Sequence, residues 1–170
     1  MNCPTAILQA AKHLNDDIKS NGFAAPQETN VHSVRSIYNE IITNPQLRKK
    51  TEKLYKDGHY AEAVEKAYKL IDNTVKARAG LKKEKITGAP LMNMVFSEHN
   101  PVLMLNEGAS TSENDEQKGY MQIFAGCMTG VRNPRAHESD WTDTEERALQ
   151  LLVFADHLLN RIELTEKKDT

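Results

Sequence analysis

The chain is poor in cysteine and has no long apolar run. Two cysteines, Cys3 and Cys127, stand among 170 residues, too few for the disulfide framework of a small secreted domain. No apolar run approaches the roughly 18 residues that a membrane-spanning helix needs. The first twenty residues lack the basic leader and apolar core of a secretory signal. These absences predict a cytoplasmic protein with free thiols and no contact with a membrane.

An excess of charge of one sign is also missing. Lys and Arg total 22 against 24 for Asp and Glu, so the formal net charge is −2. Domains that bind nucleic acid through bulk electrostatics usually carry a strong positive excess. Any contact with nucleic acid must therefore depend on a local group of cations. With 39% hydrophobic and 27% charged residues, the chain has the composition of one ordinary globular domain.

Several familiar catalytic motifs do not occur. The chain has no glycine-rich phosphate loop, no His-Glu-x-x-His helix, no Cys-x-x-Cys pair and no Gly-x-Ser-x-Gly turn. His13, His32 and His157 fall in segments with helical spacing and without a nearby ligand partner, so we interpret them as surface or structural residues. The sequence therefore predicts neither a metal site nor a cofactor.

Helical periodicity dominates what is present. Apolar residues recur every three or four positions from Tyr60 to Val75 and from Ala148 to Ile162, and we expect these two stripes to face each other. The polar stretch Gly108–Glu116 indicates an exposed loop, and residues 102–105 fit either a short strand or a buried turn. The pattern predicts an all-α bundle of five or six helices. The expected helices cover residues 7–18, 34–42, 46–56, 60–79, 116–128 and 142–162.

An unusual group of polar side chains lies between the last two expected helices. It comprises two arginines, an amide and an imidazole within six positions: Arg132, Asn133, Arg135 and His137. In one continuous helix, Arg132 and His137 would project about 140° apart. Because proline disrupts helices, we expect Pro134 to break the helix and fold His137 back towards Arg132, with Asn133 capping the following helix.

Arg132 and His137 together have a limited but specific chemistry. Arginine stays protonated and offers a planar fork that matches phosphate oxygens, while histidine gives and takes a proton near neutral pH. The pair suits transesterification at an RNA phosphodiester, in which a base activates the 2′-hydroxyl and a cation stabilises the phosphorane. The structural alternative is that Arg132 caps a helix terminus and His137 bonds a backbone carbonyl. The spacing leaves both interpretations open.

Two segments carry a family resemblance. Residues 124–138 (FAGCMTGVRNPRAHE) and residues 57–64 (DGHYAEAV) resemble the HEPN superfamily, specifically its Ymh-type branch. The resemblance covers roughly residues 45–163. It implies an HEPN-like helical bundle that dimerises and brings two Arg-x4-His elements into one cleft. On this basis we expect an N-terminal appendage of two helices over residues 1–44, an HEPN-like domain over 45–164 and a polar tail over 165–170.

The resemblance also implies an activity. Catalytic members of the superfamily are metal-independent RNases, many of them in toxin–antitoxin, abortive-infection or phage-defence systems. Arg132 and His137 match the catalytic pair, Asn133 matches a supporting polar residue, and Arg135 is expected to contact the RNA backbone. The products would be a 2′,3′-cyclic phosphate and a 5′-hydroxyl. The implied partners are RNA, a second copy of the chain, and a cognate antitoxin or defence-operon protein.

A second function stays open at this stage. Some superfamily members are non-catalytic helical modules that bind a partner protein or nucleic acid. Two groups of lysines fit either a path for RNA or a solvated face. They are Lys49, Lys50 and Lys53, and Lys82, Lys83 and Lys85. We interpret His59 as structural, and Cys127 as a small hydrophobic residue of the core.

Overall fold

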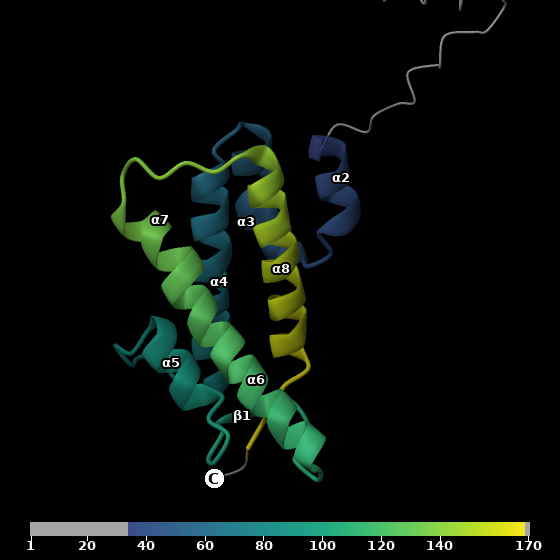
Figure 1. Ribbon diagram of the computed structural model, residues 1–170, viewed down its shortest axis with the longest axis vertical. Coiled ribbons are helices and arrows are strands. Elements are labelled where there is room, and N and C mark those ends of the chain that lie inside the picture. The colour runs from purple at the N-terminus through teal and green to yellow at the C-terminus, as the bar shows by residue number, and fades with distance from the viewer. Residues whose placement is uncertain (1–33, 169–170) are drawn as a thin grey trace, which may run out of the picture. The chain divides into compact units, whose positions relative to one another are not determined.

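The computed structural model describes residues 34–168 of the chain. The expected helix over residues 7–18, together with Cys3, His13 and His32, lies outside this range. The elements in chain order are α2 (Val34–Ile41), α3 (Pro45–Lys56), α4 (Tyr60–Ala79), α5 (Gly88–Val95), β1 (Leu103–Met104), α6 (Thr111–Cys127), the π-helical turn η1 (Met128–Arg132), α7 (Asn133–His137), α8 (Glu145–Glu163) and β2 (Glu166–Lys167). Because α6, η1 and α7 follow one another directly, the described part contains six helical segments, and the predicted all-α bundle is confirmed (Figure 1).

The central helix of the bundle is α4. It packs against α3, α5, α8 and η1, and its apolar stripe from Val64 to Val75 is fully buried. The hydroxyl of Tyr68 donates to the carbonyl of Leu151 on α8 at 3.1 Å. The two long apolar stripes therefore face each other as expected. Gly80 ends α4 in the left-handed conformation, at φ +78°, which favours glycine.

Helix α2 belongs to this bundle. Tyr38 and Ile42 are fully buried, and the ring of Tyr38 stacks on that of Tyr55 at 4.9 Å between centroids. On α8, the Asp156 carboxylate accepts the backbone N–H of Asn44 at 2.7 Å. The expected domain boundary at residue 44 stays a prediction, and among the described residues the second expected helix of the appendage packs with the bundle because Tyr38 is buried in the core.

Of the polar tail expected over residues 165–170, the structure describes residues 165–168. Strand β2 pairs antiparallel with β1, with Leu103 opposite Lys167 and Met104 opposite Glu166. Thr165 is buried, and its hydroxyl accepts from Nε of Arg78 on α4 at 2.8 Å. Of the two alternatives for residues 102–105, a short strand or a buried turn, the structure shows a strand at Leu103 and Met104. The C-terminal segment is hydrogen-bonded to the rest of the protein as far as Lys168, whose backbone N–H donates to the carbonyl of Val102.

Helix α6 begins earlier than expected, inside the polar stretch that we interpreted as a loop. Ser110 and Glu113 form a reciprocal capping box, in which each side chain accepts the other's backbone N–H. Further along, the buried Gln117 amide donates to the carbonyls of Phe96 and Leu103, both at 3.1 Å. The polar residues here are therefore not a sign of a loop: Ser110 and Glu113 cap the helix, and the Gln117 amide is buried and hydrogen-bonded. Within residues 34–168, no helix is long and apolar enough to cross a membrane.

Candidate functional site

The segment that carries the polar motif is one unbroken helical rod. In η1 the backbone N–H of Asn133 donates to the carbonyl of Met128, five residues earlier. Arg132 and Asn133 both have right-handed helical torsions, at φ −73°, ψ −48° and φ −61°, ψ −44°. The expected break at Pro134 and the expected capping role of Asn133 are therefore both wrong. The wider turn relieves the clash between the proline ring and the preceding turn and absorbs its missing donor.

Arg135 lies inside the protein. Its Nε and Nη2 donate to the two carboxylate oxygens of Asp143 at 2.6 and 2.7 Å, and Nη1 donates to the carbonyl of Val131 at 2.7 Å. The side chains of Arg135 and Asp143 are 1% and 0% exposed. The ring of Trp141 covers the guanidinium at 5.5 Å from its centroid. Arg135 therefore braces the α7–α8 loop and has no exposed face for an RNA phosphate.

Arg132 and His137 stand in a different environment. Arg132 is partly buried, and its Nη1 makes one long hydrogen bond to Oδ1 of Asn133 at 3.5 Å. Its Nε is buried and has no partner among the described residues. His137 is exposed, and its side chain forms no hydrogen bond or ion pair with a described residue. Within residues 34–168, neither side chain makes the backbone contact that the structural alternative requires.

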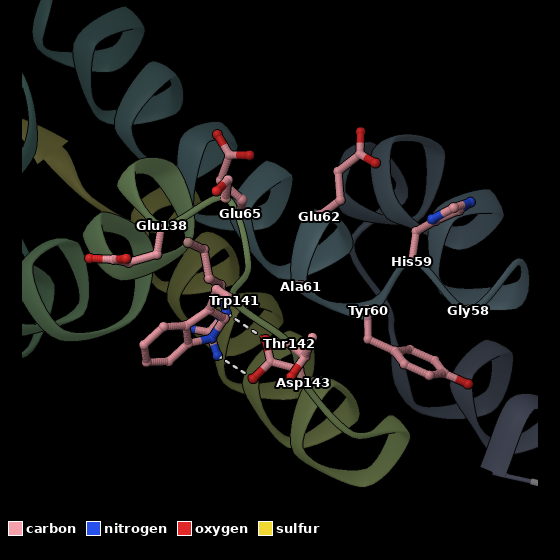
Figure 2. A pocket seen from close by; sticks show the side chains of 12 residues that line it. Gly58, His59, Tyr60, Ala61, Glu62, Glu65, Glu138, Trp141, Thr142 and Asp143 are labelled. Atoms are coloured by element: carbon pink, nitrogen blue, oxygen red, sulfur yellow. Dashed lines mark hydrogen bonds and ion pairs between the residues drawn. The ribbon is translucent and has the colours of Figure 1, made fainter.

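A pocket of about 370 Å³ joins the two segments that carry the resemblance (Figure 2). It lies between the first turn of α4 and the α7–α8 loop, which bears Trp141 and Asp143. The lining residues are Gly58, His59, Tyr60, Ala61, Glu62, Glu65, Arg135, Glu138, Ser139, Trp141, Thr142 and Asp143. The exposed His59, which we interpreted as structural, thus lies at this pocket. The sequence feature that could have identified His59 as a pocket residue is its position in the segment 57–64, which carries the family resemblance.

The pocket does not favour phosphate. Glu62, Glu65 and Glu138 contribute carboxylates to its lining, while the charge of Arg135 is already paired with Asp143. Like charges repel, so an RNA phosphate is disfavoured there. Arg132 and His137 are not among the lining residues. Within the described part of the chain, no group of three acidic, histidine or cysteine side chains is placed to hold a metal ion.

An uncovered face runs along α6 and η1 towards Arg132. Gly119, Ile123, Gly126 and Gly130 recur at intervals of four, three and four residues, which places the three α6 residues on one side of the helix. A methyl group at any of the three glycines would meet no atom within 4 Å, and Ile123 is 40% exposed. We call this surface the glycine face. The residues opposite it, including Phe124, are buried in the core.

Comparison with known proteins gives one match. Residues 42–162 match the family model Hypoth_ymh, described as a protein of unknown function. No curated protein and no solved structure matches the chain. The Ymh part of the resemblance is therefore confirmed, whereas the wider relation to the HEPN superfamily stays a prediction.

Proposed function

The chain belongs to the Hypoth_ymh family of proteins of unknown function, and from the geometry around Arg132 we propose that it is a metal-independent endoribonuclease related to the HEPN superfamily. The observation that carries this proposal is the contrast among three side chains of one short helical segment. The fold uses Arg135 for a buried ion pair, but Arg132 and His137 have no comparable structural contact among the described residues. A cation and an imidazole that the fold does not use are candidates for chemistry.

The helical segment that carries Arg132 and His137 is held in place by contacts at both ends. The Arg135–Asp143 pair fixes α7 against the following loop, and Met128 at the start of η1 is fully buried. A π-helical turn is an uncommon feature that often accompanies functional sites. Here it ends at Arg132, and α7 carries the chain on to His137, so both side chains are presented from one helical backbone, about 140° apart around its axis.

The proposed reaction is attack of a ribose 2′-oxygen on the adjacent phosphorus. His137 takes the proton of the 2′-hydroxyl, the new O–P bond forms, and Arg132 stabilises the negative charge that develops on the phosphorane. The bond to the 5′-oxygen then breaks, and that oxygen takes a proton from the protonated imidazole that a second copy of the chain supplies at the same position. The products are a 2′,3′-cyclic phosphate and a 5′-hydroxyl. Asn133, whose Oδ1 accepts from Arg132, helps to position the guanidinium.

Each chain has one His137, whereas the reaction uses two proton-transfer groups, so we expect the site to be shared between two chains. The reaction benefits from both a base and an acid, and a two-fold dimer supplies a second imidazole from the same position. The glycine face offers the contact, because its three glycines allow a partner helix to approach closely. We therefore propose a homodimer in which this face brings the two Arg132–His137 elements into one cleft. From the resemblance we further propose a role in toxin or phage-defence systems, with a cognate antitoxin as partner.

Cleavage of a fluorescent RNA by the purified full chain tests the activity. We expect Arg132→Ala to lower the rate by about 10²–10³-fold and His137→Ala by about 10²–10⁴-fold, with Arg132→Lys in between because lysine keeps the charge but not the fork. His99→Ala is the matched control, since His99 is exposed and lies outside the motif. Wild-type rates in both alanine variants would refute the proposal.

Mixing two inactive variants tests the composite site. A dimer of one Arg132→Ala chain and one His137→Ala chain retains one arginine and one imidazole, whereas each pure variant lacks one kind of group entirely. We expect the co-expressed mixture to cleave RNA faster than either variant alone. No gain on mixing, with a monomer in solution at the assay concentration, would overturn the shared cleft. Absence of cleavage by the wild-type protein would favour the non-catalytic binding module instead.

A further inference from the structure

The loop between α4 and α5 carries an unusual excess of positive charge. Residues 76–87 contain five cations and one acidic residue. Lys82, Lys83 and Lys85 are exposed, and none of them forms an ion pair with a described residue. Lys53, Lys56, Lys66 and Lys118 pair with carboxylates, whereas Lys49, Lys50 and Lys69 of α3 and α4 are exposed and, like the loop lysines, form no ion pair with a described residue. What distinguishes the loop is that three unpaired lysines stand within four positions, with Glu84 as the one acidic residue among them.

The C-terminal strand extends the same charge. Nε of Arg78 donates to the Thr165 hydroxyl at 2.8 Å, which ties this strand to α4. A methyl group on Gly80 would meet Nζ of Lys167 at 3.2 Å, so that ammonium lies beside the start of the loop. Residues 76–87 and 166–168 together hold seven cations and two acidic residues. With a net charge of −2 for the whole chain, the remainder carries −7.

Stabilisation of the fold explains part of this charge. Cations near the C-terminus of a helix interact favourably with its dipole, which accounts for Lys76 and Arg78 in the last turn of α4. The dipole effect falls off within one turn. It does not account for Lys82, Lys83 and Lys85, which follow the helix and whose like charges repel one another.

The loop is fixed at the start of α5, and this end of α5 is the one nearer η1. Asp72 of α4 accepts the backbone N–H of Gly88 at 2.6 Å, which fixes the first residue of α5. At the other end of α5, the carbonyl of Phe96 accepts from Gln117 in the first half of α6. Because α5 also packs against η1, it runs antiparallel to α6, with its loop end nearer Arg132. In Figure 1, α5 and the loop before it lie on the same side of the bundle as α7.

We propose that Lys82, Lys83 and Lys85 form a backbone-binding surface for single-stranded RNA, which leads the strand to Arg132. The inference deepens the proposed function, on which the identity of the strand as substrate rests. Ammonium groups act on phosphates as point charges and read no bases. Binding here is therefore sequence-independent and strongly dependent on salt. The localised charge satisfies the requirement for a local group of cations in a chain of net charge −2.

The experiment measures binding separately from cleavage. Fluorescence anisotropy follows the full chain binding to a single strand of about 24 nucleotides, long enough for more than one typical site. A 2′-O-methyl RNA strand serves as probe, because it lacks the nucleophilic hydroxyl and is not cleaved. The test variant is Lys82→Gln with Lys83→Gln and Lys85→Gln. The matched control is Lys49→Gln with Lys50→Gln and Lys69→Gln, which removes three exposed lysines elsewhere.

The salt dependence gives the expected result. Each phosphate neutralised on a single strand contributes about 0.7 to the slope of log affinity against log salt, so the loop variant should lose about 2 units of slope. The control should keep the wild-type slope. Arg132→Ala should lose no more than about 0.7, because it removes one phosphate contact at most. Circular dichroism and thermal melting verify that each variant is folded.

Three outcomes overturn the inference. They are an unchanged slope in the loop variant, an equal loss in the α3–α4 control, and lysine-dependent binding to phosphatidylserine vesicles without binding to the strand. Binding that depends on the loop lysines supports the inference even if the wild-type chain cleaves no RNA. In that case only the proposed ribonuclease activity fails, so the two failures are distinguishable.

Discussion

The buried pair between Arg135 and Asp143 makes a strong prediction about stability. Asp143→Asn keeps the shape of the side chain but removes the charge opposite a guanidinium whose side chain is 1% exposed. The variant leaves a buried cation that two short hydrogen bonds compensate in the native protein. Breaking such a pair by removing one partner costs about 3–5 kcal/mol. For a domain of this size, that corresponds to a fall in Tm of roughly 10–15 °C.

Urea unfolding gives the measurement. Circular dichroism reports the helices, and fluorescence reports the single tryptophan, Trp141, whose ring lies over Arg135. We expect both signals to shift to lower urea in Asp143→Asn. The control is Glu98→Gln, because Glu98 pairs with Lys118 at 2.9 Å on the surface, where the expected cost is about 0–1 kcal/mol. Equal free energies of unfolding for the two variants would refute the reasoning.

A double replacement separates charge from packing. Arg135→Met with Asp143→Leu removes both charges from the buried site, and exchanges of this kind are often neutral for stability. We expect the double variant to be more stable than Asp143→Asn by about 2 kcal/mol or more. A double variant as unstable as Asp143→Asn would mean that the specific hydrogen-bond geometry at Arg135 matters more than the unpaired charge.

Four further predictions follow from the same structure. RNA cleavage should persist in EDTA, and loss on chelation with recovery in magnesium would contradict the proposed mechanism. Ile71→Asp should lower the free energy of unfolding by about 4 kcal/mol or more because Ile71 is fully buried, while Lys69→Asp on the exposed side should cost less than about 1 kcal/mol. Burial raises the pKa of the Cys127 thiol to about 11. In a Cys3→Ser background, alkylation of Cys127 at pH 8 should therefore be roughly 100-fold slower than that of an exposed thiol, and its rate should rise with pH. Rapid labelling of the native protein would contradict the burial of this thiol. Gly126→Arg should weaken self-association measured by sedimentation and lower cleavage in parallel, because the glycine face has room for a side chain in one chain but not under a partner helix; a stable, active dimer would exclude this face as the interface.

Much of the fold follows from local sequence alone. The apolar stripes of α4 and α8 repeat at the helical period over 20 and 19 residues, so each predicts both its helix and the face that is buried. The start of α6 was equally readable, since Ser110 and Glu113 have the spacing of a capping box. A polar composition concealed that signal. Boundaries of this kind depend on a few neighbouring residues, which is why sequence patterns can identify them.

The interior of the motif depended on contacts that local patterns do not contain. Proline rules predict a break at Pro134 because they compare it with an ideal α-helix, whereas the chain continues through a π-helical turn that the packing of α6, η1 and α4 holds in place. The sequence likewise offers two arginines of equal chemistry. Asp143, eight residues further along, decides that Arg135 is the buried one. Arg132 is left with a single long hydrogen bond.

For the charges, too, the sequence determines how many there are, whereas the tertiary structure decides where they lie. The sequence alone determined a net charge of −2 and a lysine-rich segment after α4, which together predict only a local cationic surface. Pairing of β1 with β2 placed Lys167 beside Gly80 and enlarged that surface. Contacts between residues 87 positions apart, such as Arg78 and Thr165, have no periodicity along the chain. Tertiary structure decides them, because only the packing of the helices determines which distant segments meet.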